Sequence, residues 1–134
     1  MIRLGIVASQ FHNEIMEEMV KEAQTRAKKL GVKVEQIIRV PGAFDIPLAV
    51  KRLLPMSSID GVVTLGCVIK GETDHDVLVA TIPAHMILKL SLQYNKPVTL
   101  GITGPNQNEE QAIARIPRAG EVVEACVTLI KTLR

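Results

Sequence analysis

Residues 62–77 of the chain read VVTLGCVIKGETDHDV. The first half is mostly apolar, and a strand that is apolar on both faces is typical of a parallel sheet covered on both sides. Gly71 lets the backbone turn tightly, and Thr73 or Asp74 can cap a helix that follows. Ligands of parallel sheets gather at the carboxyl ends of the strands, where free N–H groups at helix starts favour anions. The stretch therefore predicts a binding loop in which His75 lies beside a phosphate or a carbonyl group.

The rest of the chain alternates between strand and helix patterns. Apolar or alternating runs predict strands at residues 2–8, 32–40, 61–69 and 97–103. Apolar residues at helical spacing predict helices at residues 14–30, 48–54, 77–94, 109–116 and 120–133. Asn13 is expected to cap the first helix, and Gly31 is expected to end it. This alternation predicts an α/β fold, a three-layer α/β/α sandwich around a four-stranded parallel sheet, with residues 1–134 as a single domain.

Composition and charge exclude several classes of protein. The 134 residues are 47% apolar and only 2% aromatic, so the core is expected to be aliphatic. The net charge of +2 comes from mixed acids and bases, and no basic block indicates a nucleic-acid partner. No stretch resembles a signal sequence or approaches the roughly 20 apolar residues of a membrane helix. Cys67 and Cys126 are too few and too far apart for a disulfide framework or a zinc site. We therefore expect a reduced, cytoplasmic protein.

A second loop, residues 40–47, reads VPGAFDIP and follows the second predicted strand. Its two prolines and its glycine fix the backbone, so Phe44 and Asp45 are held in a rigid turn. A carboxylate at a cleft can accept hydrogen bonds from a polyol, but Asp45 can equally cap the helix that follows. Phe11, one of only two phenylalanines, follows the first strand. It either stacks on a flat heterocycle or packs against the first helix.

Three further residues each allow more than one chemical role. His75 stands between Asp74 and Asp76, whose carboxylates favour a protonated imidazole suited to proton transfer near neutral pH. The alternatives are a solvated loop histidine and a metal ligand, although consecutive residues point in different directions and do not easily converge on one ion. Arg115 either presents its fork to a phosphate or compensates the end of a helix. Cys67 lies in an apolar run with no base beside it, which favours core packing over a nucleophilic role.

Four short motifs follow one another along the chain. They are SQFHN at 9–13, PGAFDIP at 41–47, GCVIKGET at 66–73 followed by His75, and EQAIAR at 110–115. In this order, over nearly the whole chain, they resemble the lumazine synthase family, and the set is far more specific than any one motif. The compact chain and the residues DHD at 74–76 resemble the archaeal branch of that family.

The resemblance implies a flavodoxin-like sheet with strand order 2-1-3-4. It implies a transferase that condenses 5-amino-6-(D-ribitylamino)uracil with 3,4-dihydroxy-2-butanone 4-phosphate to form 6,7-dimethyl-8-ribityllumazine, the penultimate step of riboflavin biosynthesis. No metal and no organic cofactor are implied. The partners implied are the two small-molecule substrates and further copies of the chain, in pentamers whose active sites lie at subunit interfaces.

The resemblance also assigns roles to residues of the motifs. His75 would move protons. The pyrimidine and the ribityl chain would be held by Phe11, Ala43, Phe44, Asp45, Val68 and Ile69, with Leu100 closing the pocket from a neighbouring subunit. Glu72, Thr73 and Arg115 would hold the phosphate.

The chain departs from the family pattern at two positions. Glu121 stands where many relatives have a lysine, which leaves Arg118 as the candidate for a second phosphate cation. His12 stands where relatives often have an asparagine.

Two other functions compete with this interpretation. An archaeal-type riboflavin synthase shares the fold, but the loop at 71–75 argues against it. A non-enzymatic flavodoxin-like or receiver module is the binding-class alternative, and a receiver would need acidic residues where this chain has Ala8, Ser9 and Gln10.

Overall fold

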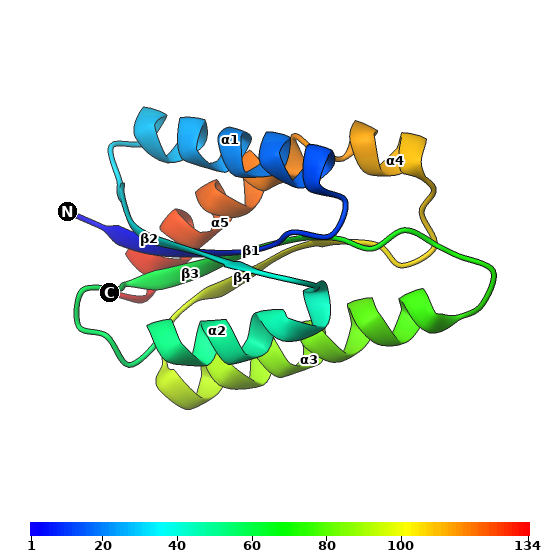
Figure 1. Cartoon of the computed structure of the whole chain (residues 1–134). Coiled ribbons are helices and arrows are strands. Elements are labelled where there is room, and N and C mark those ends of the chain that lie inside the picture. Colours follow the sequence, from blue (N-terminus) through cyan, green and yellow to red (C-terminus); the bar gives the residue numbers. More distant parts are fainter.

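The computed structural model describes residues 1–134 and contains one parallel four-stranded sheet with helices on both faces (Figure 1). The strands are β1 (Arg3–Ser9), β2 (Lys33–Val40), β3 (Gly61–Cys67) and β4 (Val98–Thr103). The helices are α1 (Asn13–Lys29), α2 (Ile46–Leu53), α3 (His75–Tyr94), α4 (Glu109–Ala114) and α5 (Arg118–Leu133), with a 3₁₀ turn η1 at Ala43–Asp45. The strand order is β2-β1-β3-β4, which confirms the predicted flavodoxin-like sandwich.

Burial explains why β1 and β3 lie in the centre of the sheet. Every residue of β3 is buried, and so is every residue of β1 after Arg3. β2 and the first half of β4 are only partly buried, as edge strands are. Each Val, Leu or Ile that leaves water contributes about 1.5–3 kcal/mol, so the most apolar strands are most stable where both of their faces are covered.

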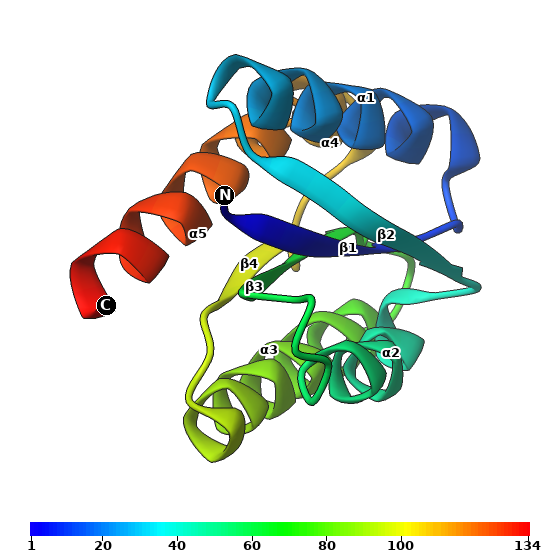
Figure 2. The same cartoon turned by 90° about the vertical axis from the view of Figure 1, so that its left-hand side faces the viewer.

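The core has two parts, one on each face of the sheet. α1, α4 and α5 cover one face, and α2 and α3 cover the other (Figures 1 and 2). Neighbouring residues of β1 alternate between the two parts: Ile6 packs with the residues of α1 and α5, and Val7 with those of α2 and α3. This period of two is the ordinary alternation of a strand, here buried on both sides.

Several boundaries differ from the expected ones by one or two residues. β3 ends at Cys67, so Val68 and Ile69 belong to the loop rather than to the strand. His12, with φ of 65°, takes the cap position of α1 in place of Asn13, which is already helical. α3 begins at His75 rather than at residue 77, so His75 is the first residue of a helix and not a loop residue.

α3 also qualifies, by length and composition alone, as a helix able to cross a membrane, so the expectation that no stretch approaches a membrane helix is wrong. In this fold it lies on the sheet and packs through Ala80, Ile87 and Leu90. Most of its apolar stretch is exposed in the single chain. Such a surface is typical of a helix that other protein covers.

The loops after the four strands gather at the carboxyl edge of the sheet, and both termini lie at the opposite edge (Figure 1). The loop after β3 is held against the loop after β4, because the Val68 N–H donates to the Thr103 carbonyl over 2.9 Å. Gly104 has φ of 104°, and a Cβ at this position would collide with the Val68 carbonyl oxygen. Only glycine meets both requirements, the backbone angle and the close approach.

We expect Gly104→Ala to destabilise the fold more than Gly31→Ala does. Both glycines have positive φ, but nothing lies within 4 Å of the Cβ position of Gly31, so that variant measures the backbone cost alone. This cost is about 1–2 kcal/mol, and Gly104→Ala adds the contact with Val68 to it. Urea unfolding of both variants measures the difference. Equal losses of unfolding free energy would show that the loop moves aside without cost.

Candidate functional site

A cavity of about 490 Å³ lies at the carboxyl edge of the sheet. Its walls come from the loops after β1, β2 and β3 and from the start of α3. The residues that line it are Phe11, His12, Pro41, Gly42, Ala43, Asp45, Cys67, Val68, Ile69, Gly71, His75, Asp76 and Val79. The lining is largely apolar with a few polar side chains, which is the composition of a small-molecule site.

Six of the predicted site residues therefore come together. They are Phe11, Ala43, Asp45, Val68, Ile69 and His75. The other predicted residues do not line this cavity. They are Phe44, Glu72, Thr73, Leu100 and Arg115.

Phe11 forms an exposed aromatic wall. Its side chain is 69% exposed, so it is not packed into the core. The backbone fixes its position, because the Gln10 N–H donates to the Val40 carbonyl and the Phe11 N–H donates to the Pro41 carbonyl. The His12 ring lies 4.6 Å from that of Phe11, at a tilt of 55°. The free face of Phe11 can stack on a flat ring.

Asp45 closes the turn that follows β2. The Gly42 N–H donates to its Oδ2 over 3.0 Å. Asp45 occupies the cap position of α2, but its side chain makes no capping bond to that helix. The carboxylate therefore fixes the turn at the edge of the cavity and is itself exposed to solvent.

The three consecutive residues around His75 have different surroundings. His75 is exposed and lines the cavity, and its backbone N–H donates to Thr73 Oγ1 over 3.3 Å. Asp76 is buried: its Oδ2 accepts from the Asn106 N–H over 2.9 Å, and its Oδ1 has no partner. Asp74 is exposed and does not line the cavity. No group of three His, Cys, Asp or Glu side chains lies close enough together to hold a metal ion.

The residues predicted to hold phosphate lie outside the cavity. Glu72 and Thr73 are exposed in the loop before α3. Arg115 ends α4 as its C-cap, and its Nη1 donates to Gln107 Oε1 over 2.8 Å. The cavity lining itself contains no lysine and no arginine.

The last two predicted residues are exposed apolar side chains. Phe44 is 60% exposed on η1, beside the lining residues Ala43 and Asp45. Leu100 is 50% exposed on the edge strand β4.

Comparison with known proteins gives a consistent answer over the whole chain. The family model described as 6,7-dimethyl-8-ribityllumazine synthase matches residues 1–134. A protein named 6,7-dimethyl-8-ribityllumazine synthase from Picrophilus torridus is 52% identical over 134 residues, which cover 100% of this chain and 98% of that protein. Proteins with the same name from Saccharolobus solfataricus and Archaeoglobus fulgidus are 51% and 47% identical, cover 99% of this chain in each case, and are themselves covered over 87% and 93% of their lengths.

The chain belongs to the 6,7-dimethyl-8-ribityllumazine synthase family. It is therefore an enzyme of riboflavin biosynthesis, and the family and reaction predicted from the four motifs are confirmed. The alternatives of a riboflavin synthase and of a non-enzymatic module are not supported. Family membership also implies small-molecule substrates and an oligomeric assembly.

Cys67 lines the cavity of this family member without the surroundings of a nucleophile. Burial raises the pKa of its thiol, and the negative charge of Glu109 raises it further, while a hydrogen bond with Thr103 acts in the opposite direction. A thiol with a raised pKa is mostly protonated at neutral pH and reacts slowly. The structure agrees with the predicted packing role.

The sequence analysis missed two buried polar residues near the site. Asp76 enters that analysis only as a charge beside His75, and Gln107 is not considered there. Both are buried because the loop after β4 folds against the start of α3 and the end of β3. No local sequence pattern predicts these contacts, because Asn106 and Asp76 are 30 residues apart and Gln107 and Cys67 are 40 residues apart.

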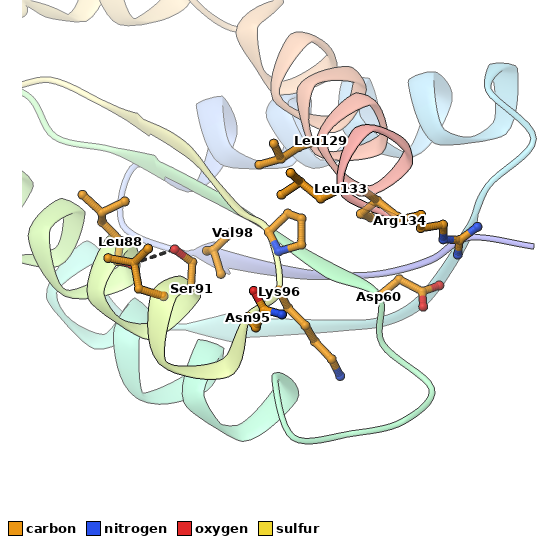
Figure 3. Close-up of a pocket in the computed structure, with 12 residues that line it drawn as sticks. Asp60, Leu88, Ser91, Asn95, Lys96, Val98, Leu129, Leu133 and Arg134 are labelled. Atoms are coloured by element: carbon orange, nitrogen blue, oxygen red, sulfur yellow. Dashed lines mark hydrogen bonds between the residues drawn. The ribbon is translucent and has the colours of Figure 1, made fainter.

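A second hollow, of about 520 Å³, lies at the other end of the sheet, between α3 and α5 (Figure 3). Leucines face it from both helices, Leu88 and Leu92 from α3 and Leu129 and Leu133 from α5. Its lysine, Lys96, donates to the carbonyls of Leu54 and Met56 over 2.8 and 2.9 Å. This groove therefore combines leucines from both helices with polar residues, which are Asp60, Ser91, Asn95, Lys96 and Arg134, and none of the predicted site residues lines it.

Proposed function

We propose that the family's condensation takes place in the cavity at the carboxyl edge of the sheet, with His75 as the acid/base residue. The substrates are 5-amino-6-(D-ribitylamino)uracil and 3,4-dihydroxy-2-butanone 4-phosphate, and the products are 6,7-dimethyl-8-ribityllumazine, phosphate and water. The observation that carries the proposal is that Phe11, Asp45 and His75, from three separate segments, line one cavity.

The first substrate has a flat ring and a polyol tail, and the cavity offers a partner for each. The exposed face of Phe11 stacks on the pyrimidine. Val68 and Ile69 lie along the edge of the ring, and Ala43 and Asp45 hold the ribityl chain, with the Asp45 carboxylate accepting from hydroxyl groups. Phe44 lies between these two residues in the chain but outside the cavity lining, and we propose that it contacts the same ribityl chain.

In the reaction, the 5-amino group attacks the ketone and an imine forms with loss of water. Phosphate is then eliminated, and the ribitylamino nitrogen attacks the remaining carbonyl, so that the ring closes with loss of a second water. Each step moves a proton, and His75 is an exposed imidazole in the cavity wall, a group that can act as a general acid or base. Holding two substrates in contact is itself a large effect for a bimolecular condensation.

The single chain offers few binding partners for the phosphate group of the second substrate. The backbone of Glu72 and Thr73 offers N–H groups at the start of α3, but the cavity lining contains no cation. Because a phosphate dianion needs a cationic partner, we propose that Arg115 enters from the adjacent subunit. Leu100 closes the pocket from the neighbour in the same way.

We propose that the assembly is a pentamer or a multiple of it. Apolar side chains are exposed along α3, including Leu78, Leu88 and Leu92, and they continue into the groove between α3 and α5 (Figure 3). Exposed apolar surface of this extent is typical of subunit contacts. We also propose a cytoplasmic location, since both cysteines are free thiols.

The first prediction for this site concerns His75. We expect His75→Ala to lower turnover on the order of a hundredfold, because a general acid or base contributes about 10²–10⁴ to the rate. The free energy of unfolding should change by no more than about 0.5 kcal/mol, because the side chain is exposed.

Turnover is measured through the fluorescence of the lumazine product at saturating substrates across neutral pH. His85→Ala, at another exposed histidine of α3 that does not line the cavity, is the matched control and should leave turnover unchanged. Wild-type turnover of His75→Ala would remove His75 from the catalytic role.

The second prediction concerns Arg115. We expect Arg115→Ala to weaken binding of the phosphorylated substrate by about 1.5–3 kcal/mol, the cost of losing a charged hydrogen-bonding partner. Affinity for the ribitylaminouracil should stay nearly the same. Calorimetric titration with each ligand separates the two effects.

Arg52→Ala, at an exposed arginine of α2, controls for the loss of one surface charge. If the variant bound both ligands more weakly by the same factor, Arg115 would be a structural residue. A larger effect of Arg118→Ala would instead make Arg118 the phosphate cation.

The third prediction concerns the shared site. Phe11→Asp and Arg115→Ala proteins, each with reduced activity, should regain some activity when they are dissociated, mixed and reassembled. Mixed rings contain interfaces in which the Phe11 side and the Arg115 side are both wild type. Light scattering is expected to give a pentamer mass or a multiple of it. A monomer mass, or no recovery despite subunit exchange, would contradict the shared-site arrangement.

A further inference from the structure

Gln107 is a fully buried amide in the loop between β4 and α4. Both ends of the amide are used. Its Nε2 donates to Thr103 Oγ1 over 2.8 Å, and its Oε1 accepts from Arg115 Nη1 over 2.8 Å. Buried amides are found where their hydrogen bonds are satisfied, and here one of the partners is the cation proposed to bind phosphate.

The surroundings of Gln107 hold its acceptor oxygen in place. The Lys70 N–H donates to its backbone carbonyl over 2.8 Å. The next residue, Asn108, starts α4 through reciprocal bonds with Gln111, over 2.8 and 2.9 Å. The Arg115 N–H bonds to the Gln111 carbonyl over 3.1 Å. Backbone and side chain of Arg115 are therefore both tied to one rigid segment.

We propose that Gln107 is a positioning residue that holds the Arg115 guanidinium in the orientation that binds the phosphate of the second substrate. This inference rests on the proposed role of Arg115. A free arginine side chain loses rotamer entropy when a ligand orders it. Gln107 removes part of that loss before the ligand arrives, because it already fixes Nη1.

The chemistry of the amide suits this task. A guanidinium has five N–H donors, and Gln107 takes up one of them, at Nη1. The remaining donors can form the two parallel bonds of an arginine–phosphate pair. Because the amide is neutral, Arg115 keeps its full positive charge for the phosphate, which a carboxylate partner at the same place would compensate.

The test is a double-mutant cycle in the assembled protein, using Gln107→Met, Arg115→Ala and the double variant. Methionine fills a similar volume but offers no strong acceptor. Binding of inorganic phosphate is measured by calorimetry, and the KM for each substrate is measured by product fluorescence.

We expect Gln107→Met to weaken phosphate binding and to raise the KM of the phosphorylated substrate roughly tenfold, as for a lost hydrogen bond to a charged group. The KM of the ribitylaminouracil should not change. In the Arg115→Ala background, Gln107→Met should add no further loss, because its effect passes through Arg115.

Thr64→Val is the control for lost stability. Thr64 is also fully buried, and its hydroxyl donates to the Thr99 carbonyl over 2.7 Å, but it does not touch Arg115. This variant should leave phosphate binding unchanged.

Three outcomes would overturn the inference. Gln107→Met could leave phosphate binding unchanged, it could raise the KM of both substrates equally, or its loss of phosphate binding could add to that of Arg115→Ala. If Arg115→Ala itself left phosphate binding unchanged, the proposed phosphate site would fail first, and the positioning role of Gln107 would fall with it.

Discussion

The burial of β3 on both faces is the constraint on which the rest of the structure depends. All seven of its residues, Gly61–Cys67, are buried, so neither face of the strand can be left to water. Helices must therefore cover the sheet on both sides, and parallel strands joined by helical crossovers end at the same edge. The position of the site follows from this: the loops after β1, β2 and β3 meet because their strands run in one direction, and the cavity lies where they meet.

Close backbone contact between two loops then fixes the shape of that edge. The Val68 carbonyl passes so near Gly104 that no side chain fits there, and the Val68 N–H bonds to Thr103. The loop after β4 is thereby held beside Val68, a lining residue of the cavity. The same loop carries Asn106, which bonds to Asp76, and Gln107, which bonds to Arg115. One loop thus organises the start of α3 and the end of α4 together.

The sequence was sufficient for most of the fold and for part of the site. Strand and helix periods are local signals, so the element order and the fold class could be predicted, and the four motifs supplied the family and the strand order. The start of α3 was placed too late because residues 71–76 are polar and lack the apolar spacing of a helix. Asp76 lies in the first turn of α3 and accepts a hydrogen bond from Asn106, a partner 30 residues away that no local pattern reveals.

The same reasoning explains why the sequence could point to Phe11 and His75 as cavity residues but not to the burial of Gln107. Phe11 and His75 lie in motifs that immediately follow strands, where the geometry of a parallel sheet predicts a site. Gln107 matters through contacts with Cys67, Thr103 and Arg115, which only the folded loop brings together. An amide in a turn segment looks like any exposed polar residue until its burial is known.

α3 extends from the candidate active site to the apolar surface that we propose to lie between subunits. Its first residue is His75, in the cavity wall, and its exposed leucines extend toward the groove at the opposite end of the sheet. The single chain lacks two things: its cavity lining contains no cation, and nothing covers much of the apolar surface of α3. In the proposed shared-site arrangement, association with a neighbour supplies the cation and covers the apolar surface in one step. The hydrophobic effect that drives such an assembly would then also bring Arg115 to the phosphate, so that an active site and a stable oligomer form together.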